Sequence, residues 1–179
     1  MSDVAEARSR IAAFGWDYLL IFGYLIVLVG IGLFLTTGPI GAEWTALMSD
    51  PVRADIVAFL LTVLPITLYF AFGEASSGAT WGKRRVGLVV ATPLAAGDGL
   101  GIGRALLRNG LKFLPWQMSH TAIFHISGSA ASSGEPPGWS VALQAIAWVL
   151  MAAYLVGLTR FGGHRPLYDR LAGTVVIRS

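Results

Sequence analysis

Three long stretches without a charged residue constrain this chain more than any other feature. They cover residues 18–42, 56–73 and 136–159. A bilayer core about 30 Å thick needs roughly 20 helical residues to cross, so each stretch predicts a transmembrane helix. Pro65 lies inside the second stretch, where we expect it to kink the helix, because neighbouring helices in a membrane can satisfy the freed backbone groups.

The composition supports a membrane location. Charged residues make up 13% of the chain and hydrophobic residues 55%, whereas soluble domains carry about 25% charged residues. This excludes a typical soluble globular protein, and the high apolar content excludes a disordered one. The chain has no cysteine, which excludes disulfides, thiolate metal sites and a cysteine nucleophile.

A fourth segment, residues 100–126, is less uniform. Its first half has a cation at every fourth position, Arg104, Arg108 and Lys112, which form one narrow stripe on a helix. Pro115 and an apolar half follow, so we interpret the segment as a helix that enters the interface and then crosses. The alternative is a re-entrant or surface helix.

The predicted fold is therefore an all-α integral membrane protein with four transmembrane helices. We place the spans at about 18–36, 55–73, 105–126 and 139–159, in a single membrane domain over 1–179. The connections on the outer side would be loops at 37–53 and 127–138.

Lysine and arginine positions predict the orientation. With four spans and a cytoplasmic N-terminus, only Arg53 among the 13 cations falls on the outer side. Cytoplasmic loops are enriched in lysine and arginine, so we expect both termini in the cytoplasm and a location in the plasma membrane. Two cytoplasmic segments contain β-branched runs, 86–92 and 174–177, which we expect to pair as a small two-stranded cap.

Three separated motifs carry a family resemblance. The first helix reads RIAAFGWDYLLI, the middle loop GATWGKRRVGLVV and the tail YDRLAGTVVI. In this order they resemble the RDD family of small integral membrane proteins, named for an arginine and two aspartates. By position the arginine is Arg10, and the aspartates are Asp17 and Asp169, the latter followed by Arg170. Other positions that fit are Gly82, Lys83, Gly87 and Gly173.

The resemblance covers nearly the whole chain, about residues 8–178, and departs from the family pattern at LPWQMSHT. A transport or ion-exchange role has been suggested for some members, and the resemblance implies such a role here.

The acidic residues near the inner face leave two interpretations open. Asp17 lies where an apolar helix begins, and an ionised carboxylate there is costly unless it is paired or hydrated. It is either a proton or cation site or a structural ion pair with a nearby lysine or arginine. Glu74 either joins Asp17 or pairs with the basic loop after it, and Asp169 either stabilises a turn or closes a buried network. The candidates for an ion or solute site are Arg10, Asp17, Glu74, Asp169 and Arg170.

Six cations near the inner face are candidates for binding anionic headgroups, because each basic residue near a membrane surface contributes about 1 kcal/mol of attraction. The alternative is ordinary topology with snorkelling side chains. We expect a lipid bilayer with anionic headgroups as partner, and no nucleic acid, since no recognition motif accompanies the charges. The six are Lys83, Arg84, Arg85, Arg104, Arg108 and Lys112.

Three further polar residues favour structural roles. Asp55 is expected to be a first-turn charge at a helix N-terminus. His120 and His125 are separated by about 140° around a helix, so we expect hydrogen bonding inside the bundle, with a proton relay through His120 as the alternative. We expect no metal, no cofactor and, in the absence of a hydrolase motif, no enzymatic activity.

The leading hypothesis is transport or exchange of an ion or small solute through a polar core of Arg10, Asp17 and Asp169, supported by Glu74 and Arg108. Four helices leave little room for a path, so we expect a homo-oligomer. The alternative is a non-transporting accessory protein that binds anionic lipid or partner subunits.

Overall fold

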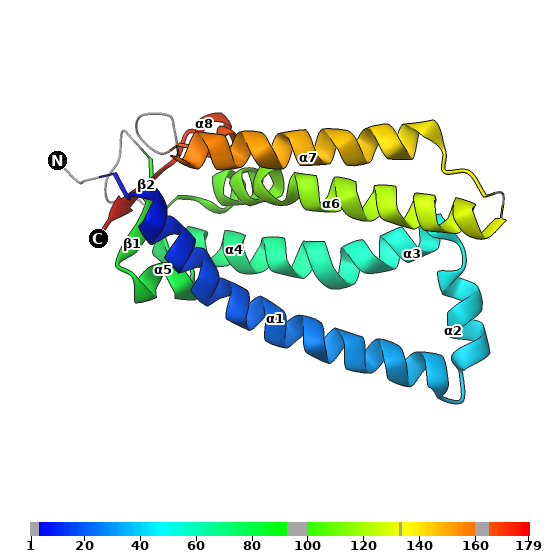
Figure 1. Ribbon diagram of the computed structural model, residues 1–179. Coiled ribbons are helices and arrows are strands. Elements are labelled where there is room, and N and C mark those ends of the chain that lie inside the picture. The colour runs from blue at the N-terminus through cyan, green and yellow to red at the C-terminus, as the bar shows by residue number, and fades with distance from the viewer. Residues whose placement is uncertain (1–3, 93–99, 133, 160–164) are drawn as a thin grey trace. The chain divides into compact units, whose positions relative to one another are not determined.

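The protein is mainly helical, with one small sheet (Figure 1). The structure is a computed structural model that describes residues 4–92, 100–132, 134–159 and 165–179, with the backbone alone at 130–132. Its strands are β1 (Leu88–Ala91) and β2 (Val175–Arg178). Its helices are α1 (Ala7–Thr37), α2 (Gly41–Met48), α3 (Pro51–Ala58), the π-helical turn η1 (Phe59–Val63), α4 (Leu64–Ser77), α5 (Trp81–Arg85), α6 (Ile102–Ser132), α7 (Gly138–Thr159) and α8 (Leu167–Leu171).

Three helices in the described part of the chain are long and apolar enough to cross a membrane: Ala7–Thr37, Pro51–Ser77 and Gly138–Thr159. They confirm the predicted helices at 18–36, 55–73 and 139–159. The fourth predicted span lies in α6, which has 31 residues. α6 is long enough to cross, but its cations and polar side chains keep it outside the apolar class, so the count of four spans is not confirmed.

The two connections predicted as outer loops are partly helical. α2 occupies eight residues of 37–53, and α6 continues to Ser132 into the stretch predicted to be a loop at 127–138. α3 begins where the sequence has strong start signals: the Asp50 carboxylate accepts a bond from the Arg53 amide at 2.8 Å, and Pro51 takes the first helical position. The prediction missed these helices because it followed the apolar runs alone.

Pro65 is accommodated by a π-helical turn. Proline has no amide hydrogen and crowds the carbonyl four residues earlier, here that of Leu61. The turn Phe59–Val63 contains Leu61, and the Tyr24 hydroxyl donates to the Leu61 carbonyl at 2.6 Å. The freed acceptor is therefore satisfied by another helix.

Pro115 lies inside α6, where a tyrosine hydroxyl also bonds the carbonyl that the proline leaves without its helical partner. The carbonyl four residues earlier belongs to Leu111, and it accepts a bond from the Tyr154 hydroxyl at 2.8 Å. α6 is consequently one continuous helix, in which the predicted basic half leads into the apolar half without a break.

The chain divides into two compact units, each described here by itself. Unit 1 comprises Met1–Ile21, Ile66–Phe113 and Leu150–Ser179, and unit 2 comprises Phe22–Pro65 and Leu114–Val149. In unit 2, small residues bring helices close together. A Cβ on Gly128 of α6 would lie 2.4 Å from Cγ of Pro51 in α3, and close approach through small residues is typical of membrane helices.

Unit 1 contains the sheet. β1 and β2 pair antiparallel, with Leu88 opposite Arg178 and Ala91 opposite Val175, which confirms the predicted two-stranded cap. The N-terminal segment, which the sequence did not predict to take part, adds a bridge from Val4 to Ile177. Both strands contribute to the apolar core of unit 1, which consists of Ala5, Ala13, Ala71, Leu88, Val90, Leu100, Ala105 and Val176.

Candidate functional site

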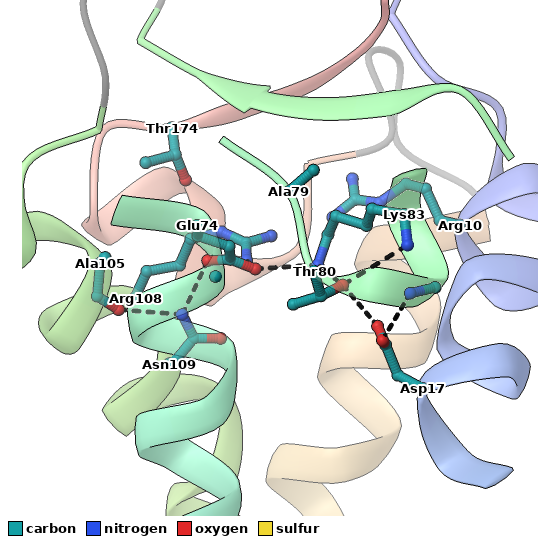
Figure 2. Close-up of polar contacts among 12 residues, drawn as sticks. Arg10, Asp17, Glu74, Ala79, Thr80, Lys83, Ala105, Arg108, Asn109 and Thr174 are labelled. Atoms are coloured by element: carbon teal, nitrogen blue, oxygen red, sulfur yellow. Dashed lines mark hydrogen bonds and ion pairs between the residues drawn. The ribbon is translucent and has the colours of Figure 1, made fainter. Parts of the chain in front are cut away.

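Unit 1 contains a cluster of buried charged side chains, shown in Figure 2. Three carboxylates are 0% exposed, and the three cations nearest to them are at most 9% exposed. They come from α1, α4, α5, α6 and α8, so the cluster connects helices from both ends of the chain. We call it the buried cluster; its members are Arg10, Asp17, Glu74, Lys83, Arg108 and Asp169.

Asp169 accepts bonds from two arginines. Arg10 pairs with its Oδ2 atom, and Arg108 Nε lies 2.7 Å from Oδ1. The Thr174 hydroxyl adds a third contact at 3.2 Å, and Gly173 with φ +63° provides the turn that leads from α8 into β2. Both interpretations of Asp169 have a counterpart in the structure: Asp169 forms a buried ion pair with Arg10, and it lies beside the turn at Gly173.

Asp169 is expected to make stability depend on acid pH. Burial raises the pKa of its carboxyl, but the charges of Arg108 and Arg10 outweigh burial and hold the pKa below its ordinary value. The stabilisation is therefore complete above the unfolded pKa and is lost as pH falls through the folded pKa. Thermal unfolding from neutral to acid pH should show an acid loss that Asp169→Asn reduces and Asp50→Asn, a change at an exposed carboxylate, does not. An identical acid limb in wild type and Asp169→Asn contradicts this assignment.

Glu74 accepts three bonds near the C-terminal end of α4. Lys83 Nζ lies 2.8 Å and Arg108 Nη1 2.6 Å from Oε1, and Asn109 Nδ2 lies 2.7 Å from Oε2. The predicted pairing of Glu74 with the loop after its helix is thus present. Arg108 contacts both Glu74 and Asp169, so it connects α4 with α8.

Asp17 differs from the other two carboxylates because all its donors are neutral. Oδ1 accepts from the Tyr69 hydroxyl at 2.7 Å and the Gly82 amide at 2.7 Å. Oδ2 accepts from the Thr80 hydroxyl at 2.5 Å (Figure 2). All ion pairs in the described chain use Glu74 or Asp169. The structural ion pair with a lysine or arginine, one of the two interpretations of Asp17, is therefore absent among the described residues.

The loop residues that hold Asp17 are placed by the start of α5. Thr80 is the N-cap of this helix and accepts from the Lys83 amide at 3.4 Å. Gly82 lies against α1: a Cβ there would be 2.1 Å from the Ala13 carbonyl oxygen and 2.7 Å from Cγ of Asp17. Glycine at this position is what allows the backbone to reach the carboxylate.

One hydroxyl connects Asp17 to the charged part of the cluster. Thr80 Oγ1 donates to Asp17 and accepts from Lys83 Nζ at 3.4 Å, and Lys83 pairs with Glu74. Only two side chains, those of Thr80 and Lys83, therefore lie between the carboxylates of Asp17 and Glu74.

Lys112 lies among aromatic rings. Its Nζ atom is 3.6 Å from the ring centroid of Phe70, 4.9 Å from that of Phe113 and 5.0 Å from that of Phe14. An ammonium is attracted to the faces of such rings. Lys112 thus lies on aromatic faces rather than in an ion pair of the described chain.

The six predicted headgroup cations have different surroundings. Lys83 and Arg108 are in the buried cluster, whereas Arg104 is exposed. Arg84 donates to the Ser77 hydroxyl and the Ala79 carbonyl. Exposed Arg85 lies 4.7 Å from the ring centroid of Trp81 and 5.5 Å from that of Trp16. Arg170, an ion-site candidate, is exposed on α8.

Four residues that bond the carboxylates of the buried cluster were not identified from the sequence. Tyr69, Asn109 and Thr174 carried no pattern that could single them out. Thr80 carried one, because a threonine directly before a short helical run is a typical N-cap. Asn109 Oδ1 is buried and has no hydrogen-bond partner among the described residues.

Two residues expected to be structural lie in unit 2. The His120 imidazole accepts a bond from the Trp116 indole at 2.9 Å, which confirms the expected hydrogen bonding. The His125 ring packs on Trp139 with centroids 4.7 Å apart. In the described chain no group of three or more histidine, aspartate and glutamate side chains could hold a metal ion.

Comparison with known proteins identifies the family. The model of the RDD family matches residues 4–173. The chain belongs to the RDD family. A search of curated proteins and a search of solved structures each returned no match. The three residues that the sequence resemblance assigned to the family's motif lie in unit 1, where Arg10 pairs with Asp169 and Asp17 accepts from the Gly82 amide of α5.

Proposed function

We propose that this RDD membrane protein exchanges protons against a cation or small solute, with Asp17 as the group that takes up and releases the proton. The observation that carries the proposal is that Asp17 is fully buried and its bonds come from two hydroxyls and a backbone amide. A hydroxyl can donate to a carboxylate and accept from a carboxylic acid. Tyr69 and Thr80 can therefore satisfy Asp17 in both protonation states.

The other two carboxylates are suited to a permanent charge. Glu74 and Asp169 form ion pairs with lysine and arginine side chains. These side chains only donate hydrogen bonds and therefore favour the ionised form of each carboxyl. Their role in the proposal is to hold Arg108 and Lys83 in place. Because Thr80 bonds both Asp17 and Lys83, neutralising Asp17 alters the surroundings of the Glu74 pair.

The membrane topology completes the proposal. α6 is the fourth span, both termini are cytoplasmic and the membrane is the plasma membrane. This arrangement is supported by the distribution of the 13 cations, of which Arg53 alone would lie outside. The buried cluster then lies near the cytoplasmic face, and a homo-oligomer provides the room for a path. The role is not enzymatic.

The test is proton flux in liposomes. Purified protein is reconstituted with a trapped pH-sensitive dye and an imposed pH gradient, and Na⁺ or K⁺ is added outside. We expect cation-dependent proton movement by the wild type and none by Asp17→Asn. Tyr69→Phe removes one reversible hydroxyl and should slow the flux. Glu6→Gln, which neutralises an exposed carboxylate before α1, should leave the flux unchanged.

Folding of each variant is checked by size-exclusion chromatography and circular dichroism. Absence of cation-dependent flux in the wild type at every pH tested contradicts the proposal, as does undiminished flux in folded Asp17→Asn.

A second candidate function is binding of anionic lipid as an accessory protein. The observation in its favour is the exposed Arg85 guanidinium beside Trp16 and Trp81, since tryptophan is enriched at membrane interfaces and arginine recognises phosphate. Anionic lipid that co-purifies with a flux-inactive wild type, and is lost from Arg85→Gln, would favour this function.

A further inference from the structure

Unit 2 contains a second polar cluster, between α3 and α6. Oδ1 of Asp55 accepts from Gln117 Nε2 at 3.0 Å, and Oδ2 accepts from the Thr121 hydroxyl at 2.7 Å. Gln117 Nε2 also donates to Thr121 Oγ1 at 3.2 Å. Gln117 and Thr121 are four residues apart and so share one face of α6. Asp55 is the fifth residue of α3, whose N-cap is Asp50, so the expectation that Asp55 is a first-turn charge was wrong.

One atom of this cluster lacks a hydrogen bond. Gln117 Oε1 is buried and has no partner among the described residues. Buried polar atoms in native proteins are nearly always bonded, and exceptions call for an explanation such as a bound ion. The orientation of an amide is assigned from its hydrogen bonds. Turning this amide over would direct Oε1 at the Asp55 carboxylate, and a cation between these acceptor oxygens would make that orientation favourable.

The charge of the cluster is also uncompensated. No ion pair of the described chain involves Asp55. His120 Nε2 accepts a bond from Trp116 and therefore carries no proton, so this imidazole is neutral. Asp55 is partly buried, and a carboxylate without an ion pair beside a membrane helix is costly unless it is hydrated or binds a cation. The sequence segments of unit 2 contain one cation, Arg53, and four carboxylates, Glu43, Asp50, Asp55 and Glu135.

We propose that Asp55, Gln117 and Thr121 bind a monovalent alkali cation such as Na⁺. Carboxylate, amide and hydroxyl oxygens are hard ligands suited to such ions. One carboxylate balances one positive charge, whereas a divalent ion would leave a net charge in the bundle. In the bound form the Gln117 amide turns so that Oε1 faces the ion. The site is distinct from the buried cluster of unit 1 and goes beyond the function proposed for Asp17.

The experiment measures sodium binding by the full-length protein in detergent. Binding of ²²Na⁺ is followed by equilibrium dialysis, and the melting temperature is measured in NaCl and in N-methyl-D-glucamine chloride at equal ionic strength. We expect saturable binding and a higher melting temperature in NaCl for the wild type. Asp55→Asn should lose both effects, and Thr121→Val, which removes one oxygen, should weaken binding about tenfold.

Asp50→Asn is the matched control. It removes the same charge from the same helix, and asparagine remains a good N-cap, so sodium binding should be retained. Equal losses in Asp50→Asn and Asp55→Asn, or no sodium-specific effect in the wild type, overturn the proposal. If Asp55→Asn does not fold, unchanged sodium affinity of Thr121→Val overturns it.

Asp17→Asn separates the two proposals. Sodium binding that persists in Asp17→Asn and disappears in Asp55→Asn supports a site in unit 2, whatever the flux assay shows. Sodium binding that disappears in Asp17→Asn and persists in Asp55→Asn assigns the ion to unit 1 and overturns the inference.

Discussion

Replacing Arg108 by methionine is expected to lower the free energy of unfolding by about 3–5 kcal/mol, because it removes one partner of a buried ion pair and leaves the other charged. Arg108 is 2% exposed and contacts Glu74 at 2.6 Å and Asp169 at 2.7 Å. Both carboxylates would keep one cation each, Lys83 and Arg10. Asp169 would lose its bond to α6, and Glu74 would keep only the α6 bond from Asn109. The measurement is unfolding in mixed micelles, followed by circular dichroism.

Arg104→Met is the control for this prediction. Arg104 lies one turn earlier on α6 and is exposed, so its replacement removes the same charge without disturbing the buried cluster. Its cost should stay within about 0.5 kcal/mol. If the two variants have equal stabilities, Arg108 does not support the cluster in the way described.

Gly82→Ala is expected to separate α5 from α1 and to cost at least about 3 kcal/mol, since it combines overpacking with loss of hydrogen bonds to a buried carboxylate. The added Cβ would lie 2.1 Å from the Ala13 carbonyl oxygen and 2.8 Å from the Asp17 amide nitrogen. Both are backbone atoms of α1, so no flexible group could move aside. The Gly82 and Thr80 contacts to Asp17 would be lost together.

Gly15→Ala provides the comparison. Gly15 lies on α1 two residues before Asp17, and a Cβ there would meet nothing within 4 Å. Alanine is better than glycine inside a helix by about 0.5–1 kcal/mol, so this variant should be slightly more stable than the wild type. A Gly82→Ala protein as stable as Gly15→Ala would show that the α5 loop does not pack on Asp17 as described.

The apolar runs predicted three spanning helices because length and hydrophobicity are local properties of a sequence. The short strands were predicted for a similar reason, since β-branched runs are visible without knowledge of the fold. The start of α3 was missed, because its signals, Asp50 and Pro51, are short and lie outside the apolar runs. The hydrogen bond that satisfies the Leu61 carbonyl near Pro65 could not be predicted either, because its donor, Tyr24, belongs to another helix.

The candidate site shows the same division. The sequence identified Arg10, Asp17, Glu74 and Asp169 as charges that need partners near a membrane face. It did not determine which partner each would take. Arg10 and Asp169 are 159 positions apart, and their pairing depends on packing of α8 beside α1. The sequence also could not separate Arg104 from Arg108, although one is exposed and the other is buried.

By itself the sequence determined a membrane protein with three helices that can span, because a bilayer selects for apolar length. Only the tertiary structure decided that Glu74 and Asp169 take the cations while Asp17 takes hydroxyls and a backbone amide. The physical reason is that burial makes every carboxylate require a donor at hydrogen-bond distance. Which donors come that close depends on how α1, α4, α5, α6 and α8 pack in unit 1.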